Sequence, residues 1–222
     1  MLRFAWLSSM NGWFSIAISF IALVVSVSTA WLTFFRAGHL RMTQPTVIFF
    51  GPDGGVLPGQ RKPLKVFLRT LLYSTARRGQ TIESLHVNLQ RGESRQNFSI
   101  WVYGQPDDLV RGSGLFVPQE GIATNHHFLL PKDGTDFQML AGDYVLRVYA
   151  KKVTAAAPEQ LASIRLRISE SQAAELIDEN TGIYFDWGPD LQAYHSHTEH
   201  KPPRSIPDEL LELVRGVSSS RG

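Results

Sequence analysis

The sequence predicts a mainly β protein, an antiparallel β-sandwich preceded by one transmembrane helix. Two patterns indicate this fold. The 23 residues from Trp13 to Phe35 carry no charge. Beyond residue 45, apolar and polar residues alternate along short segments separated by Gly, Pro, Asp and Arg-Gly turns. Half-buried alternation without intervening helices is typical of antiparallel sheets.

The apolar segment is interpreted as a permanent anchor. As a helix it would be about 34 Å long, which is enough to cross a hydrocarbon core of about 30 Å. Trp13 and Trp31 suit the aromatic belts at the two interfaces of a membrane. A cleaved signal peptide is the alternative, with Ser28-Thr29-Ala30 as its cleavage site. We favour the anchor because the apolar run continues past Ala30 and would leave a cleaved chain with exposed apolar residues at its start.

Basic residues indicate the orientation of this anchor. Arg3 and the amino terminus lie before the apolar segment, whereas Arg36 and Arg41 follow it closely. The positive-inside rule therefore favours a cytoplasmic domain, with a periplasmic domain as the alternative. The formal net charge of +2 indicates no field that would attract nucleic acid, and the absence of cysteine excludes disulfides and thiolate zinc sites.

The chain divides into an anchor and one domain. Turn signals and capping signals give these boundaries: an N-terminal tail over 1–12, the transmembrane helix over 13–35, a linker over 36–44, the β-sandwich over 45–190, and a C-terminal tail over 191–222. Ser169 and Gln172 have capping-box spacing and predict a short helix from Gln172 to Ile177. A second short amphipathic helix is expected from Pro207 to Val214 in the tail.

Aromatic residues supply a candidate partner surface. Phe98, Ile100 and Val102 alternate and are expected to face inward, which places Trp101 and Tyr103 on the opposite face. The segment from Ile183 to Pro189 is interpreted as cover for the core, with an aromatic ligand site as the alternative. A candidate ligand or partner surface therefore contains Trp101, Tyr103 and Trp187.

The stretch from Leu140 to Val148 (LAGDYVLRV) resembles a late strand of immunoglobulin-like sandwiches, in which a Gly-containing corner leads into an inward Tyr. The resemblance implies that the Tyr144 hydroxyl ties down the corner, although the cysteine pair of antibody domains is missing. The whole chain also resembles bacterial single-pass membrane proteins that carry a C-terminal immunoglobulin-like β-sandwich and have no known activity. That resemblance implies a location in the bacterial inner (cytoplasmic) membrane.

A second segment resembles a catalytic hairpin. Gly112-Ser113-Gly114 and the strand ending in Asn125-His126-His127-Phe128 are similar to the hairpin that carries the catalytic histidine of trypsin-like heat-shock proteases. The resemblance would make His127 the general base. A base also needs a nucleophile and an orienting carboxylate, and no Gly-x-Ser-Gly-Gly sequence follows. We therefore predict no protease activity.

The histidine-rich segment near the C-terminus is a candidate metal site. The run from His195 to His200 (HSHTEH) resembles the first metal motif of metallo-β-lactamases, but no later histidine follows it, so that fold is excluded. Imidazoles and a carboxylate at this spacing suit zinc or nickel. We favour a solvated polar loop for this segment, and a metal site with His195, His197, His200 and Glu199 as candidate ligands is the alternative.

These observations favour a non-enzymatic, membrane-anchored β-sandwich that binds a protein or an envelope component and needs no cofactor. Its expected partners are the lipid bilayer and a protein, without nucleic acid. The alternative function is a metal- or ligand-binding domain that uses the segment with His195, His197 and His200 and holds zinc.

Overall fold

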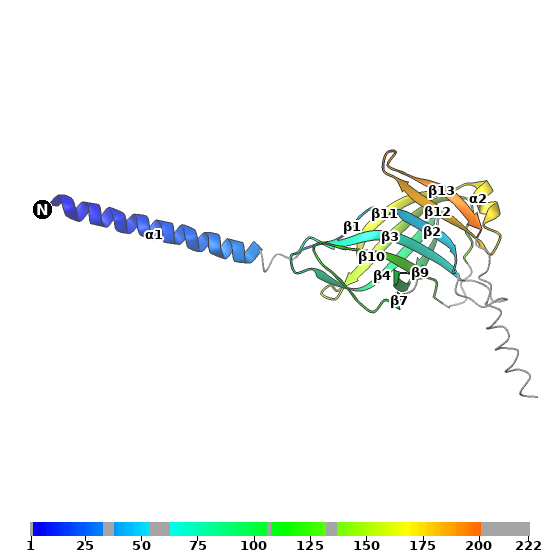
Figure 1. The fold of residues 1–222 in the computed structure, drawn as a ribbon, viewed down its shortest axis with the longest axis horizontal. Coiled ribbons are helices and arrows are strands. Elements are labelled where there is room, and N and C mark those ends of the chain that lie inside the picture. The colour runs from blue at the N-terminus through cyan, green and yellow to red at the C-terminus, as the bar shows by residue number, and fades with distance from the viewer. Residues whose placement is uncertain (1, 33–37, 54–62, 106–107, 132–136, 201–222) are drawn as a thin grey trace, which may run out of the picture.

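A computed structural model describes residues 2–32, 38–53, 63–105, 108–131 and 137–200. It contains one long N-terminal helix and an antiparallel β body that follows it in the chain (Figure 1). The expected mainly β antiparallel architecture with two sheets and one apolar N-terminal helix is confirmed. The predicted helix from Pro207 to Val214 lies outside the described residues.

Helix α1 spans Leu2–Ala30, and its window Trp13–Ala30 has a mean hydropathy of 2.0 with no part buried in the protein. The helix therefore begins before Trp13, so that residues 2–12, expected as a tail, continue the same helix. Helix propagation explains this extension. Each further residue adds one backbone hydrogen bond to a helix that has already formed, so the cost of nucleating a helix is not incurred again. By length and composition α1 could cross a membrane.

The larger sheet has eight strands in the spatial order β13-β12-β2-β3-β9-β6-β7, and β1 also pairs with β3. The bounds of these strands are β1 Leu40–Met42, β2 Val47–Pro52, β3 Leu64–Ser74, β6 Ile100–Gln105, β7 Asp108–Arg111, β9 Ile122–Leu129, β12 Thr181–Gly188 and β13 Ala193–His200. Two of them extend the body beyond its expected limits. Strand β1 lies in the expected linker, and β13 lies in the expected C-terminal tail.

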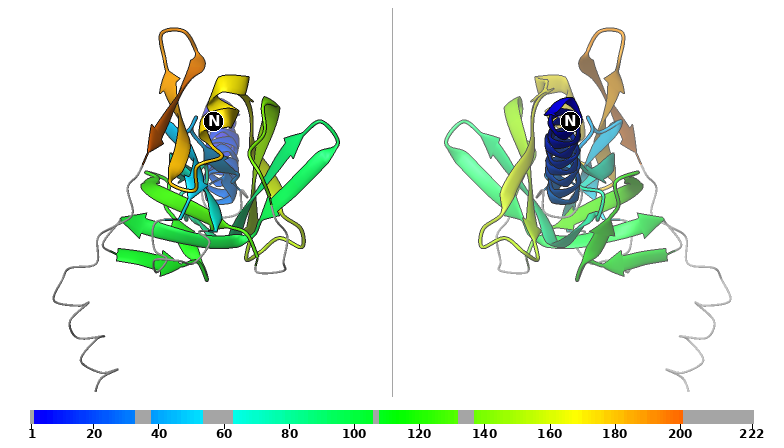
Figure 2. Two further views of the ribbon diagram at one scale, coloured as in Figure 1. Left: turned by 90° about the vertical axis from the view of Figure 1, so that its right-hand side faces the viewer. Right: turned by 90° about the vertical axis from the view of Figure 1, so that its left-hand side faces the viewer.

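The smaller sheet has five strands in the order β11-β10-β4-β5, with β8 paired to β4. Their bounds are β4 Gln80–Arg91, β5 Ser94–Phe98, β8 Leu115–Val117, β10 Gly142–Lys152 and β11 Glu159–Ile168. Helix α2, Glu170–Glu175, connects β11 to β12. The end-on views of Figure 2 place α2 between the β12–β13 hairpin and the strands of the smaller sheet.

The expected capping box is present at the start of α2. The backbone N–H of Gln172 donates to the Ser169 hydroxyl at 3.2 Å, and the Ser169 N–H donates to the Gln172 side-chain oxygen at 3.0 Å. Each bond satisfies a backbone donor that the first turn of a helix leaves without an intrahelical partner. The local sequence therefore defines where α2 starts.

The core lies between the facing sides of the two sheets. Phe50 and Phe185 of the larger sheet meet edge to face with 5.3 Å between their ring centroids. Phe128 of the larger sheet and Phe98 and Leu146 of the smaller sheet are completely buried. Burying each such side chain contributes roughly 1.5–3 kcal/mol, so these facing rows dominate the stability of the body.

The expectation that Trp101 and Tyr103 face away from the core is wrong. Trp101 is 3% exposed and belongs to the core, and Tyr103 packs against it. The chain leaves the smaller sheet after Phe98 and enters the larger sheet at Ile100, so Ser99 separates strands of different sheets. The change of sheet reverses which alternate residues face the interior, because each sheet presents its own side to the core.

The corner before β10 has the structure that its sequence indicates. The Tyr144 hydroxyl donates to the Leu140 carbonyl at 2.6 Å and accepts from the Leu140 N–H at 3.0 Å. Gly142 between them has a φ of +140°, which favours glycine. Burial raises the pKa of Tyr144, so its hydroxyl keeps its proton. Tyr144 is therefore a structural residue that fixes the chain entering β10.

We expect Tyr144→Phe to lower the free energy of unfolding by about 1–2 kcal/mol, because both hydrogen bonds to Leu140 are lost. Denaturant unfolding of the detergent-solubilised chain measures this change. Tyr149→Phe is the matched control on the same strand, since Tyr149 stacks on His86 and its ring remains in the variant. Equal losses in the two variants would contradict the role assigned to Tyr144.

Candidate functional site

The two sheets each end in an edge strand, and these two edges lie near one another. Strand β11 ends the smaller sheet and β13 ends the larger one. An edge strand presents backbone N–H and C=O groups that no neighbouring strand satisfies. A groove of about 660 Å³ lies beside both edges.

The walls of this groove, called here the edge groove, come from both sheets. The smaller sheet supplies Asp143, Tyr144, Val145 and the β11 residues Ser163, Ile164, Arg165, Leu166 and Arg167. The opposite wall consists of Gln44, Phe185, Trp187, Gln192, Ala193, Tyr194 and Ser196. The edge groove thus joins the free edge of β11 to the aromatic residues at the turn end of the β12–β13 hairpin.

Trp187 and Tyr194 form a fixed aromatic corner in the edge groove. Their rings meet edge to face at 5.1 Å between centroids. The Tyr194 hydroxyl donates to the Pro45 carbonyl at 2.8 Å and accepts from the Gln44 side-chain amide at 2.9 Å. Burial raises the pKa of Tyr194, so this phenol stays neutral. Because the hydrogen bonds hold the ring, a partner would meet a corner that is already ordered.

Charge in the edge groove comes from β11 and β10. Arg165 and Arg167 are exposed on β11. Arg167 Nε lies 3.9 Å from Asp143 Oδ1, and both side chains are more than four-fifths exposed, so this pair is weak. Two guanidinium groups against one carboxylate give this wall a net positive charge. It would favour a partner that carries carboxylates.

Helix α2 and the turn after it shield one part of the β13 edge and leave another part open. The Gln172 side-chain amide donates to the Ser196 hydroxyl at 2.9 Å and more weakly to its carbonyl at 3.4 Å. Further along, the Thr198 hydroxyl bonds to Glu175, and His200 Nδ1 lies 2.7 Å from Asp178 Oδ2. The contacts run from Ser196 to His200. Ala193 and Tyr194 therefore lie on the part of β13 that faces the edge groove.

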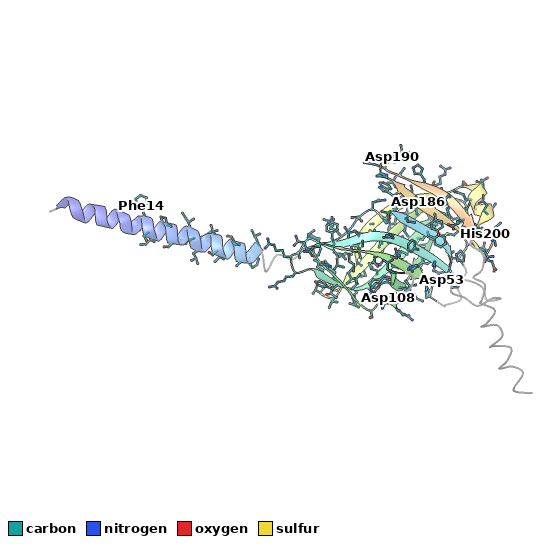
Figure 3. The ribbon with its side chains drawn as sticks, in the orientation of Figure 1. Phe14, Asp53, Asp108, Asp186, Asp190 and His200 are labelled. Carbon is teal, nitrogen blue, oxygen red and sulfur yellow. The ribbon has the colours of Figure 1, made fainter. Side chains whose placement is uncertain are left out.

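The candidate metal ligands lie on a strand, β13, instead of a polar loop. Alternation puts His195, His197 and Glu199 on one face, as expected, and His200 on the other. His197 stacks on Tyr184 at 5.4 Å, and its Nδ1 lies 3.3 Å from Asp186 Oδ2. His200 instead pairs with Asp178, and Figure 3 shows it at the end of the hairpin away from Asp190.

These histidine contacts are pairs and do not converge on one point. Among the described residues, no group of three or more His, Asp or Glu side chains is close enough together to hold a metal ion. Side chains two apart on one strand lie about 6.6 Å apart along the backbone, so converging ligands need help from a neighbouring strand. Asp186 supplies one such neighbour, for His197 alone.

The two histidines of the protease-like hairpin point to opposite faces of β9. His126 is buried, and its Nδ1 accepts from Trp101 Nε1 at 3.2 Å, while its Nε2 has no hydrogen-bond partner among the described residues. Burial, with a smaller effect of His127, lowers the pKa of His126 to about 3. Burial and Lys65 lower the pKa of His127 to about 4. Both rings are neutral at pH 7.

Among the described residues, neither histidine is hydrogen-bonded to a serine hydroxyl that could serve as a nucleophile. His127 lies against Phe67, at 5.0 Å between ring centroids. Ser113 is exposed in the turn after β7, where the Tyr103 hydroxyl bonds to the carbonyl of Gly114. Within the described residues, no hydrogen bond joins His126 or His127 to a serine hydroxyl. Trp101 and His126 instead form a buried hydrogen-bonded pair, which fixes the orientation of their two rings in the core.

The residues expected to form an aromatic partner surface are therefore separated. Trp187 lies in the edge groove, whereas Trp101 and Tyr103 pack in the interior. Sequence reasoning missed Gln44, Arg165 and Tyr194. Alternation along the segment from Tyr194 to His200 could have shown that Tyr194 faces the other way from His195. Only the pairing of strands, however, brings Tyr194 close to β11 and Trp187.

Comparison of the chain with protein-family models, curated proteins and solved structures gives no match. The function is therefore argued from the geometry of the described residues.

We expect His126 to make the protein less stable as the pH falls. Its pKa is near 6.5 in the unfolded chain and about 3 in the folded one, so the unfolded state binds the proton first. The contribution of the neutral His126 ring to the free energy of unfolding is therefore complete above pH 6.5. Below that pH the free energy of unfolding declines by about 1.4 kcal/mol per pH unit. Urea unfolding between about pH 7 and about pH 5 should lose about 2 kcal/mol through this residue.

His126→Gln is the control variant, since its amide oxygen can still accept from Trp101 Nε1 but does not titrate. Its stability should fall less steeply below pH 6.5 than that of the unmodified protein. The same slope in both proteins would show that His126 is already solvated.

Proposed function

We propose that this protein is a membrane-anchored, non-enzymatic β-sandwich that binds an extended segment of a partner protein in the edge groove. The observation that carries the proposal is the free edge of β11, which lies beside the ordered aromatic corner of Trp187 and Tyr194. An added strand can bond to backbone groups of the edge while its alternate side chains enter neighbouring pockets.

An immunoglobulin-like topology is part of the proposal. Strands β2, β3, β9 and β6 are adjacent in the order of the A, B, E and D strands of that fold, and β11, β10 and β4 follow the order of G, F and C. Tyr144 near the start of β10 bonds back to Leu140, as a tyrosine corner does in strand F. The β12–β13 hairpin is then an addition beside strand A that builds one wall of the edge groove.

The chemistry of the edge groove favours an extended segment with an apolar side chain and a carboxylate. The apolar side chain would contact Trp187 and Tyr194, and the carboxylate would pair with Arg165. Arginine offers two parallel donors to a carboxylate, which fixes the direction of the bound segment. No bond-making step is assigned, because the edge groove holds no nucleophile next to a base among the described residues.

The anchoring part of the proposal places α1 in a bacterial inner membrane with the sandwich on the cytoplasmic side. The window from Trp13 to Ala30 carries no charge and no part of it is buried in the protein, which supports the membrane location. The basic residues Arg36 and Arg41 after the helix support the cytoplasmic orientation. That the membrane is a bacterial inner membrane is what the resemblance to bacterial single-pass membrane proteins implies.

Amide hydrogen exchange tests the edge groove. A partner that adds a strand should slow exchange at those β11 amides between Leu161 and Arg167 that point away from β10, and leave β5, the opposite edge of the smaller sheet, unchanged. Arg165→Glu should weaken binding at least tenfold, since it replaces an attraction by a repulsion. Arg95→Glu makes the same charge change on β5 and should bind normally. Protection centred on β5 would refute the assigned site.

Carbonate extraction of native membranes tests the anchor. The full chain should stay in the membrane pellet, because about 20 apolar residues in the hydrocarbon core resist extraction. Leu23→Arg together with Val24→Glu should release the chain, because both side chains lie within the apolar window. A chain of reduced mass that washes off the membrane would instead indicate a cleaved signal peptide.

A further inference from the structure

One end of the β body is fixed close to the end of α1 by the connection between them. Backbone bonds join His39 to Thr75, with the Thr75 N–H donating to the His39 carbonyl at 2.9 Å. The His39 N–H donates to the Thr75 hydroxyl at 2.7 Å, and the Gln80 side chain bonds to the Gly38 carbonyl. Figure 1 shows α1 leading into the body at this end, where β1 begins.

Further hydrogen bonds bring two more loops to the same end. The Ser74 N–H donates to the Pro118 carbonyl at 3.1 Å, and the Val153 N–H donates to the Thr81 carbonyl at 3.1 Å. Phe116 is the register partner of Thr81, so Phe116 and Val153 lie on either side of that residue. The turns after β3, β8 and β10 therefore share one end of the body, called here the near end.

The connection is short. Five residues, 33–37, separate Leu32 from Gly38, and at no more than about 3.6 Å per residue they span at most about 22 Å. A domain on so short a tether must hold its near end close to the lipid headgroups if α1 crosses the membrane. This step rests on the anchoring part of the proposed function.

The side chains of the near end suit a lipid interface. Phe116 is 56% exposed and Val153 is 61% exposed, although each could have been polar without loss to the core. The Phe116 ring lies against the turn at Gly79, and the exposed residues Arg77 and Arg78 come directly before Gly79 in that turn. Arg41 is exposed on β1 nearby. Apolar side chains flanked by arginines are typical of surfaces that enter the headgroup region.

We propose that the near end is a second membrane contact, in which Phe116 and Val153 enter the headgroup–acyl boundary and Arg77, Arg78 and Arg41 bind anionic phospholipid phosphates. The contact would hold the sandwich upright on the bilayer, with α2 and the end of β13 directed away from it. The edge groove then faces sideways, where a partner bound to the same membrane surface can reach it.

The sequence makes this proposal simple to test, because the chain contains no cysteine. Single cysteines at Val153, Ile177 and Ala22 would each carry an environment-sensitive fluorophore in the full chain. Ile177 is 82% exposed and lies just after the end of α2, so it is an apolar control away from the near end. The proteins are reconstituted in phosphatidylcholine vesicles with about a third phosphatidylglycerol.

A headgroup-labelled nitroxide lipid should quench the Val153→Cys probe at least threefold more than the Ile177→Cys probe. Arg77→Glu with Arg78→Glu should reduce this quenching in the anionic vesicles and have a smaller effect in pure phosphatidylcholine, because each charge near an anionic surface changes binding about fivefold. Phe116→Ser should reduce it in both lipids, since its contribution is apolar.

The Ala22→Cys probe separates the two proposals. Quenching of this probe by an acyl-chain nitroxide together with equal quenching at Val153→Cys and Ile177→Cys would overturn the second contact and leave the anchor standing. Loss of quenching at Ala22→Cys would overturn the anchor itself, and with it the reason for placing the near end at a membrane.

Discussion

The facing apolar sides of the two sheets hold this protein together, because removing them from water is the dominant favourable contribution to folding. Phe50, Phe128 and Phe185 supply one side, and Phe98 and Leu146 supply the other. Helix α1 takes no part in this core, since none of its apolar window is buried in the protein. The packing of the two sheets therefore stabilises the β body without α1, and the location of α1 depends on its own apolar surface.

Two packed sheets leave edge strands with unpaired backbone groups. The edges of β13 and β11 differ in how far other residues cover them. Part of the β13 edge is covered by Gln172 of α2 and by Asp178 in the turn after α2, which bond to side chains that would otherwise face water. The edge of β11 has no such cover among the described strands. An uncovered edge is a liability for aggregation unless it is used, and the ordered corner of Trp187 and Tyr194 beside it is consistent with use.

Buried polar groups show which parts of the core are fixed by hydrogen bonding. Tyr144 satisfies both its donor and its acceptor capacity at Leu140, so it can be buried at little cost. His126 accepts from Trp101 but leaves Nε2 without a partner among the described residues. Two buried polar residues on the facing sheets thus differ in how completely they are hydrogen-bonded. Burial lowers the pKa of His126, so its ring stays neutral in the core.

The sequence alone determined features that depend on nearby residues. The apolar window of α1, the capping box of Ser169 and Gln172, and the corner at Tyr144 all involve residues within a few positions of one another. Strand alternation also placed His195, His197 and Glu199 on one face. Such patterns are local, so composition and spacing are enough to predict them.

The tertiary structure decided the features that depend on pairing between distant segments. Alternation shows which residues share a face, but not which face meets the core, and the change of sheet at Ser99 put Trp101 inside. The pairing of β12 with β2 brought the C-terminal hairpin, with Trp187 and Tyr194, to the edge of β11. Contacts between strands so far apart in the chain follow from how the whole core packs, and no local pattern encodes them.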